Sequence, residues 1–431
     1  MGPAPPFRYV RMRDTLSGAH AGVRPDAGEA EGVSIMSMSE NVRQQMVEGS
    51  WIRRMFEEGA ALKALHGADK VCDLSLGNPI AEPPEEFTAE VRRLIDNPLP
   101  GMHRYMANAG YEETRAAVAA QLQRETGASV TARDVVMTCG ASGAMNMVLK
   151  TLLNPGEEVI VLAPYFVEFL GYVDNHGGTP RVVKWAPGFV PDLAAIEAAI
   201  GKKTKAIIMN SPNNPTGVVY PEDVVQGLGE LLARKEAELG QQIYLVSDEP
   251  YRRLLFDGLL PVPVFQHYHN SVVVTSHSKD LALPGERIGY AALNPESDNH
   301  DELMAGFIHC NRVLGFVNAP ALMQRAVTNL QGVTVSIEQY ERKRDMLYGE
   351  LSGMGYDVVR PQGAFYLFPK APVDDDVQFV RELLSFLVLV VPGRGFGAPG
   401  YFRMSYCVDD RTLENSLEGF RKAADLYGLR P

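Results

Sequence analysis

Residues 271–289 of the chain read SVVVTSHSKDLALPGERIG, an apolar run followed by a polar stretch with a lysine. The apolar run predicts a buried strand, which places Lys279 just after a strand end, where sites on α/β sheets collect. Serines flank the lysine, and Arg287 follows it. An amine that can form an imine, beside hydroxyls and a guanidinium that can hold a phosphate, suits pyridoxal phosphate. A lysine between serines is also typical of a solvated loop. The rest of the chain is therefore needed to distinguish a cofactor site from such a loop.

The size and charge of the chain exclude several classes of protein. Its 431 residues allow two domains or one large domain with a sizeable core. The net charge of −12 disfavours nonspecific binding to nucleic acid or to anionic membranes. No apolar run approaches the roughly 18 residues of a membrane span. The 4 cysteines contain no C-x-x-C pair, which predicts a reduced, cytoplasmic protein.

Strands and helices alternate in the middle of the chain. Most of the predicted strands, such as Val159–Leu162 and Val272–Ser276, are continuous apolar runs rather than alternating patterns. Such runs are typical of strands whose two faces are both covered by helices. The sequence therefore predicts an α/β fold with a central, mostly parallel sheet.

The outer parts of the chain differ from this middle part. Residues 1–35 are rich in Gly, Ala, Pro and Arg and predict a disordered extension. Residues 36–76 are predicted to form helix and a short strand. This segment is expected to pack with a smaller α+β domain at residues 321–431. Residues 77–320 are then expected to form the large domain.

Small and polar residues follow two of the predicted strands. Residues 139–144, CGASGA, join a strand to a helix. Their small side chains leave the backbone amides at the helix N-terminus accessible, which suits binding of an anion. A plain tight turn is the alternative. Residues 210–217, NSPNNPTG, contain Asn214, whose amide suits an oxygen of a ring. A Pro/Asn turn is the alternative there.

A carboxylate and an aromatic residue follow two other strands. Asp248 lies in residues 247–251, SDEPY, and a carboxylate at a buried strand end is costly without a cationic partner. A pyridinium nitrogen would be such a partner, with Tyr251 donating to the ring oxygen; a helix N-cap is the alternative for Asp248. Phe166 opens a helix and offers an aromatic face for stacking, although core packing explains it equally well.

Together these clusters resemble the fold-type I aminotransferases of class I and II, an aspartate aminotransferase-like family that uses pyridoxal phosphate. The resemblance covers roughly residue 40 to the C-terminus. It rests on three motifs that are jointly very specific: S-x-S-K-x-x-x-x-x-G-x-R-x-G at Lys279, N-x-P-x-N-P-T-G at Asn214, and D-E-x-Y at Asp248.

The resemblance implies a role for each residue around the cofactor. Lys279 would hold the cofactor as an internal aldimine and carry protons between the substrate Cα and the cofactor. Asp248 would pair with the pyridinium nitrogen, and Phe166 would stack on the ring. Asn214 and Tyr251 would bond the phenolic oxygen. The phosphate would be held by the side chains of Ser276, Ser278 and Arg287 and the backbone amides of Ala141 and Ser142.

The resemblance also implies where a substrate binds. Arg403 matches the arginine that grips the substrate α-carboxylate, a role that a planar guanidinium suits better than lysine. Gly77 matches the glycine that approaches the same carboxylate. Tyr105 resembles a tyrosine that reaches the phosphate of the neighbouring subunit, which implies a homodimer. Arg312 lies near the place of an arginine for a distal carboxylate, but the spacing is one residue off, and a solvated helix arginine fits better.

The implied function is transfer of an amino group from an L-amino acid to a 2-oxo acid. Elimination, replacement or cyclisation on the same cofactor stays open, because the cofactor stabilises the carbanion whatever leaves next. A DNA-binding regulator of this fold is a third alternative, but residues 1–35 lack a helix-turn-helix pattern. No metal site is predicted, since His267 and His269 have no further ligand cluster.

Overall fold

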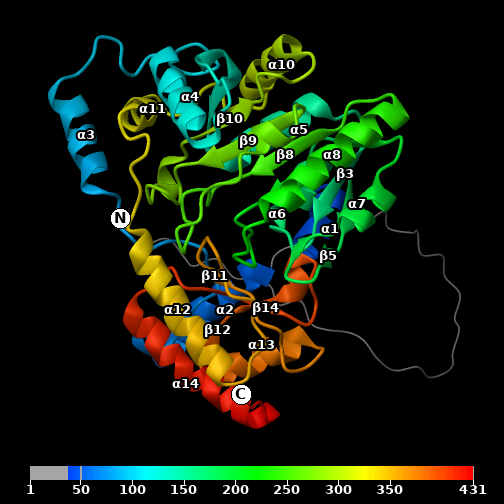
Figure 1. The fold of residues 1–431 in the computed structure, drawn as a ribbon. Helices are drawn as coiled ribbons and strands as arrows, with labels where there is room; N and C mark the ends of the chain where they lie inside the picture. Colours follow the sequence, from blue (N-terminus) through cyan, green and yellow to red (C-terminus); the bar gives the residue numbers. More distant parts are fainter. Residues whose placement is uncertain (1–36, 49–50, 431) are drawn as a thin grey trace, which may run out of the picture. The chain divides into compact units, whose positions relative to one another are not determined.

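The computed structural model describes residues 37–48 and 51–430 (Figure 1). The chain divides into two units, Met1–Gln44 and Gln45–Pro431. The predicted disordered extension, residues 1–35, lies outside the described residues. The sheets and the cavity discussed below all belong to the second unit.

A central sheet positions the functional residues. In the described part of the chain its seven strands have the order β2-β10-β9-β8-β7-β3-β4 (Figure 1). Strand β10 (Gly289–Leu293) is antiparallel to both of its neighbours, and the other pairs are parallel. The predicted α/β fold with a mostly parallel sheet is confirmed. The other strands are β2 (Val135–Thr138), β3 (Glu158–Leu162), β4 (Thr179–Val183), β7 (Thr204–Asn210), β8 (Tyr244–Asp248) and β9 (Ser271–Ser276).

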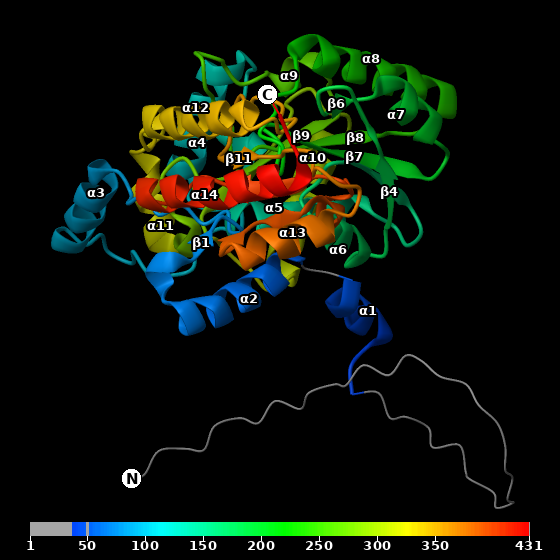
Figure 2. The same ribbon diagram turned by 90° about the horizontal axis from the view of Figure 1, so that it is seen from below.

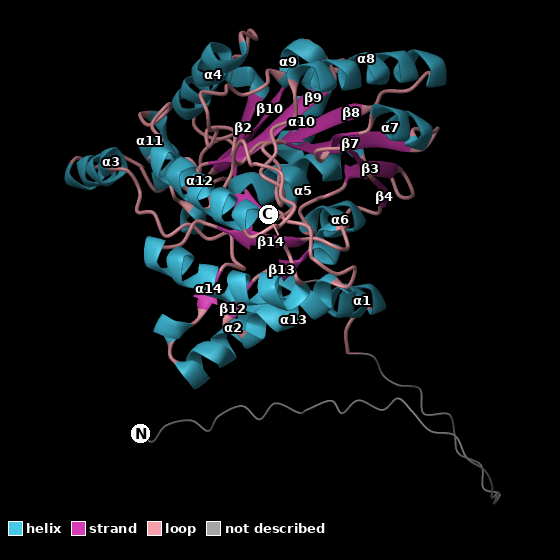
Figure 3. Cartoon of the chain, turned by 60° about the horizontal axis from the view of Figure 1, so that its bottom comes forward, coloured by secondary structure: helices cyan, strands magenta, loops and turns pink. Residues whose placement is uncertain are grey.

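Helices cover both faces of this sheet (Figure 3). Successive strand residues point to opposite faces, so in β7 Ile208 packs into one apolar core and Ile207 into another. This explains the continuous apolar runs, because both alternating sets of side chains are buried. One face carries α5 (Gly140–Leu152), α6 (Glu168–Asp174) and α10 (His300–Val313); the other carries α4 (Glu112–Thr126), α7 (Leu193–Ala199), α8 (Glu222–Leu239), α9 (Val264–His267) and α11 (Ala321–Thr328).

The C-terminal part contains helices and short strands. Helix α14 (Asp410–Tyr427) lies between α12 (Ile337–Gly353) and α13 (Asp376–Ser385) (Figure 2). A three-stranded antiparallel sheet has the order β11-β14-β13. Its strands are β11 (Tyr366–Leu367), β13 (Val391–Pro392) and β14 (Phe402–Ser405). Earlier in the chain lie α1 (Glu40–Glu48), α2 (Trp51–His66), α3 (Glu85–Asp96), β5 (Trp185–Ala186) and β6 (Val190–Pro191).

A short strand links the N-terminal segment to the C-terminal part. Strand β1 (Cys72–Asp73) pairs in parallel with β12 (Val388–Leu389). Beyond β1, the carbonyls of Ser75 and Gly77 accept hydrogen bonds from side chains of the cavity described below rather than from a strand. These two carbonyls therefore hold cavity side chains rather than extend β1. The domain boundaries at residues 76 and 320 stay a prediction.

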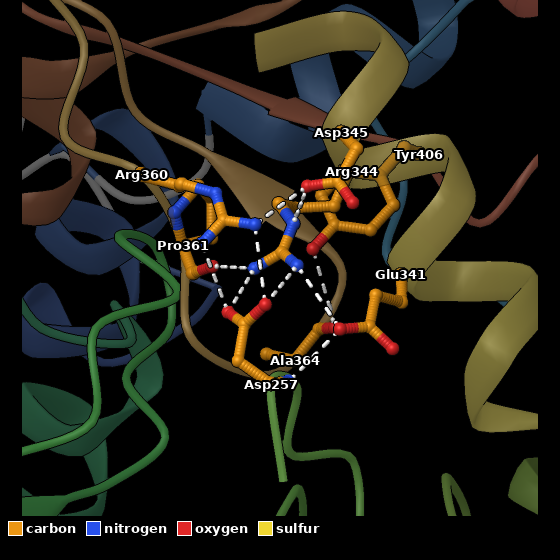
Figure 4. Close-up of polar contacts among 8 residues, drawn as sticks. All are labelled: Asp257, Glu341, Arg344, Asp345, Arg360, Pro361, Ala364 and Tyr406. Atoms are coloured by element: carbon orange, nitrogen blue, oxygen red, sulfur yellow. Dashed lines mark hydrogen bonds and ion pairs between the residues drawn. The ribbon is translucent and has the colours of Figure 1, made fainter. Parts of the chain in front are cut away.

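A buried arginine ties helix α12 to the loop that follows strand β8. Arg344 is fully buried, and its Nη1 and Nη2 donate to the two carboxylate oxygens of Asp257 at 2.9 and 3.0 Å (Figure 4). Its Nη1 also donates to the carbonyl of Pro361 at 2.7 Å. Arg360 bonds the same carboxylate at 3.0 and 3.2 Å. These bonds hold Asp257 in a left-handed backbone conformation, with φ of 56°.

We expect Arg344→Met to lower the free energy of unfolding by about 3 kcal/mol, because it removes the buried cation that pairs with the carboxylates of Asp257, Glu341 and Asp345. The matched control is Arg342→Met on the same helix. Arg342 is exposed and makes a single ion pair of 3.7 Å with Asp410, so its loss should change stability by less than about 0.5 kcal/mol. Urea unfolding measures both variants, and equal losses would contradict the prediction.

Candidate active site

A cavity of about 300 Å³ lies at the carboxyl ends of the parallel strands. Strands β7, β8 and β9 end at Asn210, Asp248 and Ser276, and all three residues line it. This is where ligands bind in open α/β sheets. The cavity brings together most of the residues predicted from the sequence: Gly77, Ala141, Ser142, Phe166, Asn214, Asp248, Tyr251, Ser276, Ser278, Lys279, Arg287 and Arg403.

Lys279 extends into this cavity from the loop after β9. Its Nζ donates a hydrogen bond of 2.9 Å to the carbonyl of Gly77. Burial lowers the pKa of Lys279 to about 8, and the nearby guanidinium groups of Arg403 and Arg287 act in the same direction. Near neutral pH part of the amine is therefore unprotonated, which is the form that attacks a carbonyl or accepts a proton.

Asp248, the last residue of β8, is buried at the edge of the cavity. Asn210 donates to its Oδ2 at 3.0 Å. Burial, and then the neighbouring Glu249, raise the pKa of Asp248 to about 8. Within the described residues, no Lys, Arg or His lies within ion-pair distance of it. A bound ring with a protonated nitrogen would supply the missing charge, so this carboxylate fits pyridoxal phosphate.

The start of helix α5 and Arg287 form a site that suits a phosphate. The amides of Ala141 and Ser142 lie in the first turn of the helix, where backbone N–H groups have no partner within the helix. Arg287 donates to the carbonyl of Cys139 at 3.3 Å, which places its guanidinium beside that turn. A cation beside a helix N-terminus favours an anion, so this corner fits the cofactor phosphate.

Gly140 allows Arg287 to lie this close. Its φ is +73°, and a Cβ there would come within 2.7 Å of Nη2 of Arg287. We expect Gly140→Ala to raise the dissociation constant for pyridoxal phosphate at least about tenfold, since backbone strain and displacement of the guanidinium both act on the phosphate. Gly143→Ala is the control, because its Cβ would make an ordinary contact of 3.4 Å. Titration of both apoenzymes with pyridoxal phosphate checks this, and equal constants would contradict it.

Tyr251 and Asn214 face the middle of the cavity. The hydroxyl of Tyr251 shares a hydrogen bond of 2.9 Å with that of Tyr366, and burial raises the pKa of Tyr251. The side-chain oxygen of Asn214 accepts from Arg403 at 3.1 Å, which leaves its amide nitrogen available to an oxygen of a ligand. Phe166 is half-buried and packs edge-on against Phe169 while lining the cavity.

Arg403, on strand β14, is a buried cation whose N–H groups are only partly hydrogen-bonded. Its Nη2 donates to the carbonyl of Ser75 at 2.6 Å, and its guanidinium lies over the rings of Tyr366 and Phe396 at 4.8 and 4.7 Å. Its Nε has no hydrogen-bond partner among the described residues. A buried guanidinium with an unpaired N–H suits a carboxylate of the substrate.

Two predicted site residues lie outside this cavity. Tyr105 is 88% exposed and lines a separate hollow with Phe316 and Val317. Arg312 is exposed in the last turn of α10. The predicted reach of Tyr105 into a neighbouring subunit, and the predicted substrate contact of Arg312, stay predictions.

The cavity also contains residues that were not predicted as site residues. Glu168 and Tyr172 lie one helical turn apart on α6, and both line it. Tyr366, on β11, shares a hydrogen bond with Tyr251, and Asn210 donates a hydrogen bond to Asp248. Only Asn210 had a signal in the sequence, since it is the first residue of the N-x-P-x-N-P-T-G motif. The others could be found only once α6 and β11 were placed against the sheet.

Buried charges hold the loop that carries Lys279. The next residue, Asp280, accepts from Arg253 at 3.2 Å and lies 3.1 Å from Nδ1 of His277.

Among the residues that the structure describes, no cluster of three or more His, Cys, Asp or Glu could hold a metal. In the same part of the chain, no helix has the length and apolar character needed to cross a membrane.

Comparisons with known proteins agree on one family. Residues 69–420 match the family described as aminotransferase class I and II. The chain is 36% identical over 366 residues to a probable aspartate/prephenate aminotransferase of Thermus aquaticus, covering 83% of this chain and 92% of that protein. An amino transferase structure from Eubacterium rectale has a TM-score of 0.88 and 37% identity, covering 91% of this chain and 99% of the other. The aspartate aminotransferase of Thermus thermophilus with maleate has a TM-score of 0.79 and 31% identity, covering 90% and 100%.

Proposed function

The chain belongs to the class I and II aminotransferase family, and on this premise we propose that the cavity around Lys279 is its active site. The protein is a pyridoxal phosphate-dependent enzyme that transfers an amino group from an L-amino acid to a 2-oxo acid. The sequence prediction of family, fold, activity and cofactor is confirmed. Transamination is favoured over elimination, replacement or cyclisation, because the reported relatives are aminotransferases by name.

One observation supports the assignment of the site more than any other. A single cavity contains an amine with a lowered pKa, a buried carboxylate without a cation and a buried guanidinium with an unpaired N–H. These are Lys279, Asp248 and Arg403. Each is costly to bury alone, and a cofactor with an aldehyde, a basic ring nitrogen and a bound amino acid would satisfy all three.

The residues around the cavity suit the parts of the cofactor. When bound, pyridoxal phosphate supplies a covalent attachment for the amino group and an electron sink that weakens the Cα–H bond. We propose that Asp248 bonds the ring nitrogen and that Phe166 covers one ring face. Asn214 and Tyr251 are proposed to donate to the phenolic oxygen. The phosphate is assigned to the side chains of Ser276, Ser278 and Arg287 and the amides of Ala141 and Ser142.

The chain's own side chains perform the proton transfer in this proposal. Arg403 binds the α-carboxylate and, with Gly77 beside it, orients the substrate so that its Cα–H bond faces Lys279. Lys279 Nζ takes the proton from Cα, because its pKa of about 8 leaves part of the amine free to accept it. The buried walls of the cavity keep water from competing for that proton.

We also propose a homodimer in the cytoplasm. The homodimer rests on the resemblance of Tyr105 to a tyrosine that reaches a neighbouring subunit, and its 88% exposed ring in the hollow with Phe316 and Val317 is accessible for such a contact. The four cysteines are free thiols, which supports a reducing compartment.

The test is a panel of L-amino acids mixed singly with the loaded enzyme. Transamination leaves the amino form of the cofactor, so the visible absorption band should disappear with a good donor and return with 2-oxoglutarate, pyruvate or oxaloacetate. Elimination would release its product without leaving that form, and this result would overturn the proposal. Arg312→Ala should be measured together with the parent enzyme. A loss of activity confined to dicarboxylic substrates would assign Arg312 to the substrate site, and an unchanged substrate profile would remove it from that site.

A further inference from the structure

A second carboxylate faces the cavity from helix α6. Glu168 is the first residue of that helix and lines the cavity with Phe166, two residues earlier, and Tyr172, one turn later. Glu168 is an exposed residue that borders the cavity. The motifs of the family resemblance do not include it, and none of the cofactor contacts proposed above requires it.

The cations that line the cavity already have proposed roles. The described side chains that line the cavity include three cations, Lys279, Arg287 and Arg403. The proposed function assigns these to the amino group, the phosphate and the α-carboxylate. Within the described residues, no ion pair engages Glu168. The surrounding protein desolvates the carboxylate and so raises the pKa of Glu168, while the positive charge of Arg403 lowers it.

The position of Glu168 relates it to the substrate side chain. Glu168 lines the same cavity as Arg403 on β14, where the α-carboxylate is assigned, and Tyr366 on β11. A substrate held there by Arg403 extends its side chain into the space that this carboxylate borders. A distal carboxylate in that space would meet Glu168 without a free cation from the described lining, whereas a distal ammonium would supply the partner that Glu168 lacks.

We propose that Glu168 selects the substrate, favouring L-amino acids whose side chain ends in an ammonium group over those that end in a carboxylate. This inference rests on the proposed function, because it takes Arg403 as the site of the α-carboxylate. It departs from the two Thermus relatives reported above, whose names contain aspartate, an amino acid with a side-chain carboxylate.

Three amino acids of equal chain length test this selection. L-Ornithine, L-norvaline and L-glutamate share five carbons and end in an ammonium, a methyl and a carboxylate group. Single-turnover loss of the visible absorption band measures the rate constant and apparent dissociation constant for each. We expect the parent enzyme to prefer ornithine over norvaline at least tenfold, and norvaline over glutamate, in the ratio of these two constants.

Glu168→Gln should reduce the preference for ornithine over norvaline to less than threefold and increase the relative use of glutamate about tenfold. Glu168→Asp should restore part of the preference. The control is Glu197→Gln, which removes the same charge from the surface, where Glu197 pairs with Arg234 at 3.0 Å; its ratios should match the parent.

The outcomes separate this inference from the proposed function. If norvaline reacts but the parent shows no preference for ornithine, or if Glu168→Gln keeps the parent's ratios, the role of Glu168 is overturned while transamination stands. If none of the three, nor any other L-amino acid of the panel, removes the absorption band, both proposals fail.

Discussion

Replacing Lys279 by Ala should abolish the visible absorption band of the bound cofactor and reduce turnover by at least about 10⁴-fold. Among the described residues that line the cavity, Lys279 is the only one with a primary amine. The variant therefore loses both the covalent attachment and the group that moves the proton at Cα. The spectrum of the protein after dialysis against pyridoxal phosphate measures the first effect, and a single turnover with a good amino donor measures the second.

Lys150→Ala is the control for this variant. Lys150 is exposed in the last turn of α5, and its loss should leave the band and the rate unchanged. Misfolding should not explain the effect at position 279, because within the described part of the chain Nζ donates one hydrogen bond, to the carbonyl of Gly77, and burial of this amine is itself costly. Full activity in Lys279→Ala would remove the site assignment.

Asp248→Asn is expected to have the next largest effect, lowering kcat/KM by about 10³-fold. The amide has nearly the same shape and can still bond Asn210, but it cannot carry the negative charge that would keep the ring nitrogen protonated. Steady-state kinetics with a saturating cofactor concentration measures the loss. A decrease of less than tenfold would show that this carboxylate does not control the electron sink.

The apoenzyme gives an independent test of Asp248. Burial raises the pKa of this carboxyl from 3.8 to about 8, so the folded state holds a proton that the unfolded chain releases. The free energy of unfolding should therefore fall as the pH rises from about 4 to about 8. In Asp248→Asn this contribution disappears, and the variant should gain stability relative to the parent between pH 5 and pH 8, by an amount on the order of a few kcal/mol. An equal difference between variant and parent at both pH values would contradict this.

Much of the fold could be predicted from the sequence because its signals are local. The predicted strands Val159–Leu162 and Val272–Ser276 match β3 and β9 to within one residue, since a fully buried strand reads as an apolar run. The lengths of the short strands, such as β1, could not be predicted in this way. Their length depends on which neighbour accepts each hydrogen bond, and at Ser75 and Gly77 the partners are the side chains of Arg403 and Lys279.

The sequence by itself determined the family and the cofactor. Lys279, Asp248 and Asn214 stand at strand ends inside specific motifs, and parallel strands bring such ends to one edge of a sheet. Only the tertiary structure decided what surrounds that edge. The placement of α6 brings Glu168 to the cavity, that of β11 brings Tyr366 to Tyr251, and these contacts join segments far apart in the chain. No local pattern encodes them, because they depend on how whole elements pack against one another.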